Sequence, residues 1–332
     1  MKFSIKCWGI PLLFLFLISC QHNQAQLKVI QGNAIGTTYS IRYLDTEDRN
    51  FESAVEELIT AVNRSTSTYQ PNSIISRVNR GDTAVTVDNY FIEVFEKSAK
   101  IHKETNGAFD PTIGVLVNAW GFGPEPADEN LDSLKIKTLL QFVGFEKVSL
   151  VNGKIQKQYP DIYFDFNAIG KGHLVDVIGR HLENHQIRNY LVEIGGEIRT
   201  RGVNQHQLPW KIAIENPNYD GSRSFATTIE LDDKSMATSG NYRKFRETDD
   251  GQKFVHTINT TTGMAIESNL LSASVIAKKD CSEVDAYATA FMAMGLEATK
   301  AFVESRDDLE VFLIYSDTEG NLKTYQYPLY TK

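Results

Sequence analysis

Hydrophobic positions along the chain alternate between two spacings. Apolar residues that recur at every second position predict strands, and those that recur every three or four positions predict helices. The expected strands cover residues 29–30, 38–44, 147–151, 154–158, 162–164, 190–194, 210–215, 225–231, 253–258, 270–277, 311–315 and 322–327. The expected helices cover residues 51–62, 90–104, 110–120, 168–183 and 282–294. Strands in runs, with helices interspersed irregularly, favour an α+β layered fold with a mixed sheet and packed helices.

Turn residues mark several of the boundaries between these elements. Asn106-Gly107 is typical of a helix end, and Asp110-Pro111 is typical of an N-cap followed by proline at the first helical position. Asn152-Gly153 lies between two short strand patterns and predicts a hairpin. No repeat and no linker rich in proline or glycine follows Gln26, which favours one continuous catalytic unit over residues 27–332.

The first residues have the pattern of a secretory signal. Lys2 and Lys6 precede the apolar stretch 10–18, which is too short to cross a bilayer comfortably. Residues 17–20, Leu-Ile-Ser-Cys, fit a bacterial lipobox, so we expect cleavage before Cys20 and acylation of its thiol. An ordinary cleaved signal or an uncleaved anchor is the alternative.

This interpretation divides the chain into a lipoprotein signal peptide at 1–19, a polar tether at 20–26 and the domain at 27–332. The mature protein is then expected to be exported and lipid-anchored to a bacterial membrane, at the periplasmic face of the inner membrane.

Composition narrows the possible partners. Of three cysteines, Cys7 lies in the signal and Cys20 is the expected lipid site, so Cys281 has no partner for an intramolecular disulfide. The 42 acidic residues outnumber the 34 basic ones, which argues against nucleic acid as a ligand. The chain is long enough to hold itself together by its core.

Two glycine-containing segments are candidates for nucleotide binding. Residues 165–172, Asp-Phe-Asn-Ala-Ile-Gly-Lys-Gly, lead from an expected strand into an expected helix. Backbone N–H groups at a helix start, glycines and a lysine make a plausible phosphate cradle, although the spacing is not that of a P-loop and a tight turn is the alternative. Residues 192–197, Val-Glu-Ile-Gly-Gly-Glu, most simply indicate a turn or bulge.

Two further segments carry polar side chains suited to catalysis. His256 lies among hydroxyl residues before a glycine turn, where a histidine is more often structural than a base. Asp285 and Thr289 stand four residues apart and therefore share one helix face. A carboxylate and a hydroxyl so placed can hold a hard cation such as Mg²⁺; the alternative is that Asp285 interacts with the helix dipole in the first turn and that Thr289 bonds back to its own helix.

Taken together and in order, these segments resemble the ApbE family of FAD:protein FMN transferases. The similar segments span nearly the whole mature chain and lie at residues 32–39, 67–73, 107–114, 119–123, 165–172, 193–197, 238–243, 256–263 and 285–295. The resemblance implies an enzyme that cleaves the pyrophosphate of FAD with Mg²⁺, passes FMN to a threonine or serine hydroxyl of a partner protein and releases AMP.

The resemblance also implies roles for single residues. The metal would be held by the Ala168 carbonyl, the Asp285 carboxylate and the Thr289 hydroxyl, with His256 as the candidate base. The residues implied to contact FAD are Ile35, Tyr69, Ala119, Trp120, Gly121, Asp165, Lys171 and Ile258. The implied partners are exported flavin-bearing subunits of electron-transfer complexes, recognised through an Asp-x-x-(Ser/Thr)-Gly-Ala-(Ser/Thr) sequence.

One segment departs from the family pattern His-His-Ile-Ile-Asp-Pro-x-Thr-Gly. Here Val255, Asn259 and Thr260 replace the first histidine, the aspartate and the proline. His256 remains available as a base, whereas an acidic role at position 259 is excluded. Three alternatives stay open: a pyrophosphatase that hydrolyses FAD to FMN and AMP, a non-catalytic FAD-binding lipoprotein, and a purely structural envelope lipoprotein.

Overall fold

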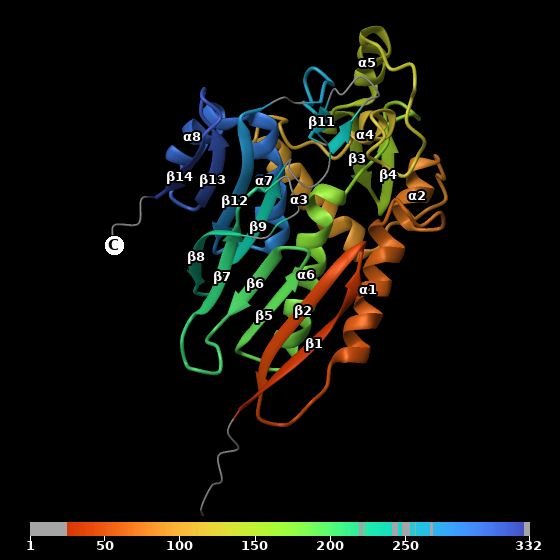
Figure 1. The fold of residues 1–332 in the computed structure, drawn as a ribbon. Coiled ribbons are helices and arrows are strands. Elements are labelled where there is room, and N and C mark those ends of the chain that lie inside the picture. Colours follow the sequence, from red (N-terminus) through yellow and green to blue (C-terminus); the bar gives the residue numbers. More distant parts are fainter. Residues whose placement is uncertain are drawn as a thin grey trace, which may run out of the picture.

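An eight-stranded sheet forms the centre of the molecule (Figure 1). The computed structural model describes residues 25–218, 222, 224–240, 245–247, 253–255, 257–265 and 268–328. In spatial order the strands are β1 (Gln26–Ala34), β2 (Thr37–Asp45), β5 (Tyr190–Ile194), β6 (Glu197–Arg201), β9 (Ser235–Gly240), β12 (Leu270–Ala277), β13 (Glu310–Ser316) and β14 (Leu322–Tyr327). The α+β class is confirmed, but every neighbouring pair in this sheet is antiparallel, so the sheet is not mixed.

Smaller elements surround this sheet. Three two-stranded sheets are β3 (Val148–Val151) with β4 (Lys154–Lys157), β7 (Trp210–Glu215) with β8 (Phe225–Leu231), and β10 (Phe245–Glu247) with β11 (Lys253–Val255). The helices are α1 (Glu52–Thr66), α2 (Ile74–Asn79), α3 (Asn89–Glu104), α4 (Gly114–Ala119), α5 (Ser133–Leu139), α6 (Asn167–Asn184), α7 (Cys281–Met294) and α8 (Leu296–Glu304), with short 3₁₀ turns at Leu140–Phe142 and Phe145–Lys147.

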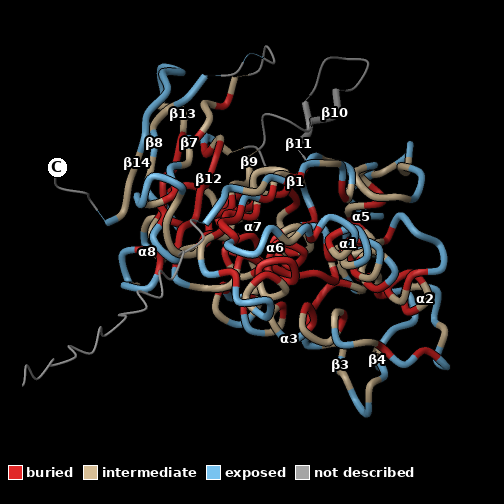
Figure 2. The backbone as a smooth tube through the Cα atoms, turned by 90° about the horizontal axis from the view of Figure 1, so that it is seen from below, coloured by how far each residue is buried: buried red, intermediate tan, exposed pale blue. Residues whose placement is uncertain are grey.

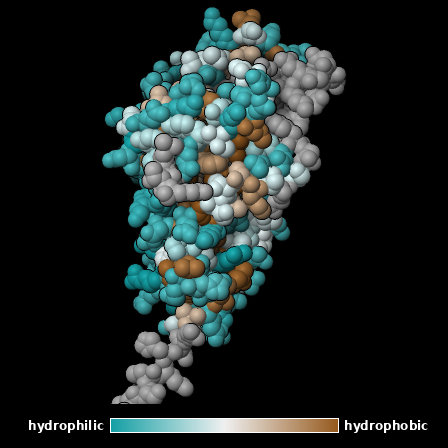
Figure 3. Space-filling model, turned by 60° about the vertical axis from the view of Figure 1, so that its left-hand side comes forward, coloured by the Kyte–Doolittle hydropathy of each residue, from teal (hydrophilic) through white to brown (hydrophobic). Residues whose placement is uncertain are grey.

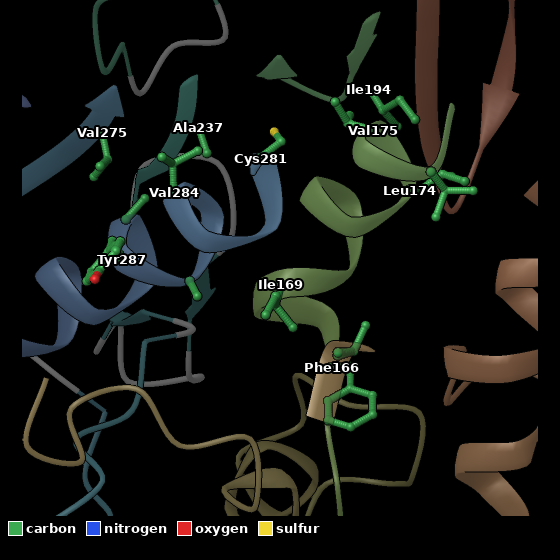
Figure 4. Packing of buried hydrophobic residues seen from close by; sticks show 14 of the residues in the cluster. Phe166, Ile169, Leu174, Val175, Ile194, Ala237, Val275, Cys281, Val284 and Tyr287 are labelled. Atoms are coloured by element: carbon green, nitrogen blue, oxygen red, sulfur yellow. The ribbon is translucent and has the colours of Figure 1, made fainter. Parts of the chain in front are cut away.

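The side chains of the sheet divide between two cores. Along β5, Tyr190, Val192 and Ile194 point to the large core under α6 and α7, while Leu191 points to the opposite face. That opposite face is partly covered by the β7–β8 hairpin. Figure 2 shows the buried backbone gathered at α6 and α7, with α3 outside them, and Figure 4 shows side chains of α6 and α7 packed toward the sheet. The fold is therefore layered, as strands of period two require.

A buried carboxylate of α6 fixes the start of α7. Asp176 is fully buried, and its oxygens accept the backbone N–H groups of Cys281 at 2.8 Å and Ser282 at 2.9 Å. Arg199 of β6 donates to the same carboxylate at 2.8 Å and so compensates its charge. Because first-turn N–H groups lack helical acceptors, this contact caps α7 from another helix and sets its position against α6.

Two sequence-based predictions were wrong in detail. No helix opens at Asp110: α4 begins at Gly114, because the Asp110 carboxylate instead accepts the N–H groups of Thr112 and Phe145 and ties two loops together. The expected strand at 162–164 is reduced to a single bridge between Tyr163 and Ile113. The expected helix at 51–62 and those at 90–104, 168–183 and 282–294 are confirmed within a few residues.

The surface is mainly hydrophilic on the face shown in Figure 3, with hydrophobic side chains scattered among polar ones, as is usual for a folded domain. Across the described ranges, none of the helices combines the length and the apolar content that a bilayer crossing requires. The proposed signal at 1–19, Cys20 and most of the tether lie outside the described residues.

Candidate active site

A large cleft opens where the start of α6 meets α7 and the turn between β5 and β6. Its volume is about 1730 Å³. It brings together eight of the residues singled out in the sequence, namely Ile35, Tyr69, Asp165, Ala168, Lys171, Ile258, Asp285 and Thr289. These residues come from widely separated parts of the chain, so the cleft is the place where the predicted site is assembled.

Asp285 is held in this cleft by the backbone of α6. Its side chain is 2 % exposed, and its Oδ2 accepts the N–H of Gly172 at 3.0 Å. In a regular α-helix that N–H would donate to the carbonyl of Ala168, four residues earlier. The Ala168 carbonyl therefore shares or loses its helical donor, and it lies in the first turn of a helix whose start lines the cleft.

The two glycines beside Lys171 serve different purposes. A methyl group on Gly170 would meet no atom within 4 Å, so this glycine leaves open space at the cleft. A methyl group on Gly172 would lie 2.5 Å from the carbonyl oxygen of Cys281. The prediction that the glycines of residues 165–172 form part of a phosphate cradle was therefore wrong for Gly172, whose missing side chain lets α6 and α7 cross closely.

Lys171 forms an ion pair that the sequence did not suggest. Its Nζ lies 2.7 Å from Oε1 of Glu197, which is 1 % exposed, while Oε2 of that carboxylate has no hydrogen-bond partner in the described part of the chain. Burial raises the pKa of Glu197 to about 8, against the opposing effect of Lys171. Burial also raises the pKa of Asp285, again opposed by Lys171. Lys171 thus lowers the pKa of both buried carboxyl groups against the larger effect of their burial, and a glutamate directly after Gly-Gly was the only signal for Glu197.

Thr289 lies one helical turn beyond Asp285 on the same wall of the cleft. Its hydroxyl lies 3.2 Å from the hydroxyl of Ser239. A carboxylate, a hydroxyl and a backbone carbonyl are all oxygen donors, the ligand type that Mg²⁺ prefers, and Mg²⁺ usually keeps several waters or phosphate oxygens as well. No cluster of three or more His, Cys, Asp or Glu side chains suited to a metal occurs among the described residues, so a multi-carboxylate or thiolate site is not seen there.

Asp165 and Tyr69 both line the cleft. Asp165 is 9 % exposed, and its carboxylate accepts the N–H of Asn167 at 2.7 Å, at the point where α6 begins. Tyr69 is 59 % exposed, so its ring is available at the surface of the cleft.

Three residues implied to contact FAD lie outside the lining of the cleft. Ala119 is buried, Gly121 is exposed in a positive-φ turn, and the Trp120 indole N–H donates to the carbonyl of Gly263 at 2.9 Å. Trp120 packs against the small core formed by α4 and α5. That core also contains Ile258, so Trp120 lies close to one residue of the cleft although none of the three lines it.

The segment that departs from the family pattern keeps its turn. Asn259 Oδ1 accepts the N–H groups of Thr261 and Thr262, both at 2.9 Å, and Thr260 Oγ1 donates to the carbonyl of Gly107 at 2.7 Å. A carboxamide oxygen accepts these bonds as a carboxylate would, so the turn does not require aspartate. His256 lies outside the described residues; the strand expected at 253–258 is confirmed for β11, and Ile258 forms a single bridge with Ala265.

Comparison with known proteins places the chain in one family. The model of the ApbE family matches residues 35–313. The chain belongs to the ApbE family. It is 35 % identical to the FAD:protein FMN transferase of Vibrio cholerae over 95 % of this chain and 96 % of that relative. It is 32 % identical to the FAD:protein FMN transferase of Escherichia coli K12, over 95 % of this chain and 93 % of the relative.

Solved structures of the family share the fold. The flavin transferase ApbE from Vibrio cholerae superposes with a TM-score of 0.81 at 34 % identity, covering 92 % of this chain and 98 % of that one. The apo form of the flavinyl transferase ApbE from Pseudomonas stutzeri superposes with a TM-score of 0.80 at 28 % identity, covering 91 % and 95 %.

Proposed function

We propose that this ApbE-family chain transfers FMN from FAD to a serine or threonine hydroxyl of an acceptor protein and releases AMP. One observation carries the proposal: a single cleft unites Asp285, Thr289 and Ala168 with Lys171 at the start of α6. The relatives named FAD:protein FMN transferase support it, since they match this chain over nearly its full length.

Mg²⁺ fits the donors on the cleft wall. Asp285, Thr289 and the carbonyl of Ala168 would hold it, and when bound it would neutralise the negative charge of the pyrophosphate. Burial raises the pKa of the Asp285 carboxyl group because it disfavours the charged form. A cation bound beside this group would stabilise the charged form.

The chain itself supplies binding and alignment for phosphoryl transfer. The start of α6 lines the cleft with its positive dipole end, which suits an anionic phosphate, while the N–H groups of Asn167 and Ile169 already donate to Asp165 and to the Phe166 carbonyl. Lys171, held by Glu197, adds a fixed positive charge beside it. Fixed charges and dipoles of this kind stabilise the charge that develops on the phosphoryl oxygens in the transition state.

The reaction forms one bond and breaks one. The acceptor oxygen attacks the phosphorus on the FMN side of the pyrophosphate, and the bond from that phosphorus to the bridging oxygen breaks, so AMP leaves with the bridging oxygen. The acceptor hydroxyl proton must go to a base, because a hydroxyl pKa lies far above neutral pH. His256 is the proposed base.

The acceptor proteins and the cellular location of the enzyme are proposed from the sequence. We propose that the acceptors are exported flavin-bearing subunits with the sequence Asp-x-x-(Ser/Thr)-Gly-Ala-(Ser/Thr), and that acylated Cys20 holds the enzyme at the periplasmic face of the inner membrane.

Incubation with FAD, Mg²⁺ and a peptide of that acceptor sequence separates the candidate functions. A transferase yields peptide that carries FMN, together with AMP. A pyrophosphatase yields free FMN and AMP, and a binding protein or a purely structural lipoprotein yields no AMP. Free FMN with unmodified peptide would contradict the proposal; a peptide whose acceptor threonine is replaced by valine is the control for the attachment site.

A further inference from the structure

One edge of β7 faces the cleft. The consecutive residues 211–216 all line it, although Ile212 and Ile214 point toward the main sheet and Lys211 and Ala213 are exposed on the other side. Side chains of a strand alternate between two faces, so consecutive lining residues show that the edge itself is presented. Within the described part of the chain β7 pairs with β8 alone, which leaves its second edge open for hydrogen bonding.

Beside this edge, part of the outer face of the main sheet lines the cleft. The β7–β8 hairpin packs over Leu191 of β5, Ile198 of β6 and Met236 of β9, and no residue of β2 belongs to that core. Ser40 and Arg42 of β2 and Glu193 of β5 therefore line the cleft as its floor. In Figure 1 the strands β1, β2 and β5 continue the sheet beyond the hairpin.

The floor carries Arg42 on β2 and, diagonally across on β5, Glu193, whose carboxylate accepts the N–H of Gly196 at 2.8 Å. Arg42 is exposed, and its guanidinium makes no hydrogen bond or ion pair with any residue that the structure describes. Lys211 of β7 is also mostly exposed. Its ion pair with Glu230 is solvent-exposed and therefore weak. An acidic side chain placed between β2 and β7 would find Arg42 and Lys211 in the same open space, which Glu193 and Glu215 also line.

The cleft is larger than one ligand needs. Its volume of about 1730 Å³ exceeds the roughly 300–1,000 Å³ typical of small-molecule pockets. A strand added to β7 would lie about 4.8 Å from it, in the second layer and above the open face of β2 and β5, because packed sheets stand about 10 Å apart. There is thus room for a dinucleotide and for an extended peptide next to it.

We propose that the open edge of β7 docks an extended segment of the acceptor protein as a third strand of the β7–β8 sheet. This inference rests on the transferase function proposed above. The segment hydrogen-bonds through its main chain to β7, places an acidic side chain against Arg42, and so brings the acceptor hydroxyl toward Asp285 and Thr289 in the same cleft.

Backbone methylation of the acceptor peptide tests strand pairing directly. In an added antiparallel or parallel strand, every second residue directs its N–H to β7. N-methylation at successive positions should therefore raise the KM for the peptide about tenfold at every second residue and much less at those between. No effect at any position, or an effect without this alternation, would overturn the docking mode.

Charge reversal on the floor tests the second contact. Arg42→Glu should raise the KM for the acceptor peptide about tenfold and leave the FAD dissociation constant, followed by flavin fluorescence, unchanged. Arg42→Lys should restore most of the affinity. The matched control is Arg188→Glu, an exposed arginine that does not line the cleft and should behave as wild type. Equal KM values for Arg42→Glu and the control would contradict the proposal.

The outcomes of these experiments distinguish a failure of the docking mode from a failure of the proposed transferase function. If the unmethylated peptide is flavinylated by the wild-type chain while methylation has no periodic effect, only the docking mode fails. If that peptide is never flavinylated and FAD is merely hydrolysed, the transferase function fails and the docking mode with it. A stable dimer in sedimentation that the peptide dissociates would assign the edge to a second copy of the chain and overturn the proposal.

Discussion

Gly172→Ala is expected to destabilise the protein, because the added methyl group has no room. It would lie 2.5 Å from the Cys281 carbonyl oxygen and 2.7 Å from Cα of Ser282. These are backbone atoms at the start of α7, which Asp176 holds in place, so they cannot rotate away as a side chain would. Relief of the overlap requires α6 and α7 to separate by about 0.5–1 Å, against close packing.

The size of the effect follows from two opposing terms. Overpacking in a closely packed core costs about 1–3 kcal/mol. Alanine is a better helix former than glycine by up to about 1 kcal/mol, which offsets part of that loss. We therefore expect the free energy of unfolding to fall by about 1–2 kcal/mol. The separation of the helices should also weaken the Gly172 N–H bond to Asp285 and lower the transfer rate.

Gly170→Ala is the matched control two residues away on the same helix. Its methyl group meets nothing within 4 Å, so only the gain in helix propensity remains, and the free energy of unfolding should rise by about 0.5–1 kcal/mol. Gly170 also lines the cleft, so this variant should bind FAD more weakly if phosphate approaches the start of α6 closely.

Urea unfolding followed by circular dichroism measures both variants. Gly172→Ala should shift the midpoint down and Gly170→Ala should shift it up, each with an unchanged slope. Equal midpoints for the two variants would refute the packing role assigned to Gly172. If Gly170→Ala is stable and binds FAD as tightly as wild type, then FAD does not approach the backbone closely at Gly170.

Three further variants test single groups of the site. Thr289→Val keeps the shape of the side chain but removes the hydroxyl, so it should raise the Mg²⁺ concentration needed for half-maximal transfer about tenfold. Thr289→Ser keeps the hydroxyl and should stay close to wild type. If both variants need the same Mg²⁺ concentration in calorimetry or kinetics, Thr289 is not a metal ligand. Glu197 has a folded-state pKa of about 8, above its ordinary value of 4.5, so its contribution to stability is present below pH 4.5 and is lost as the pH rises through 8. The free energy of unfolding should therefore fall between pH 5 and 8 by at most about 1.4 kcal/mol per pH unit, and Glu197→Gln should flatten that slope in urea titrations; parallel slopes would argue against it. His256→Ala should slow FMN transfer by about 10²–10⁴-fold with FAD binding retained, and full activity would exclude His256 as the base.

The strongly periodic elements could be predicted from the sequence. The apolar spacing of α1 and α3 records which face of each helix is buried, and that information is local. The Asp285–Thr289 pair was predictable for the same reason, because residues four apart on a helix share a face. Their position in one cleft with Lys171 was implied by family resemblance and not by spacing.

Other features depend on contacts between distant segments. The strands β6 and β9 were not predicted, because buried polar residues interrupt their apolar alternation: Glu197 pairs with Lys171, and Ser235 donates to the Lys279 carbonyl. A buried polar side chain is tolerated in the core only when a partner elsewhere in the fold makes its hydrogen bonds, and the local sequence pattern does not show which residue that partner is. The same holds for Gly172, whose neighbour Cys281 lies more than one hundred residues away.

The central claim is that Asp285 holds a divalent cation beside the pyrophosphate of FAD, and one measurement tests it most directly. Mass spectrometry of the acceptor peptide after incubation with FAD should show attached FMN for the wild-type chain with Mg²⁺. It should show none with the chelator EDTA, and none for an Asp285→Ala variant with an unchanged circular dichroism spectrum. Undiminished FMN attachment by Asp285→Ala, or by the wild-type chain without Mg²⁺, would contradict the account.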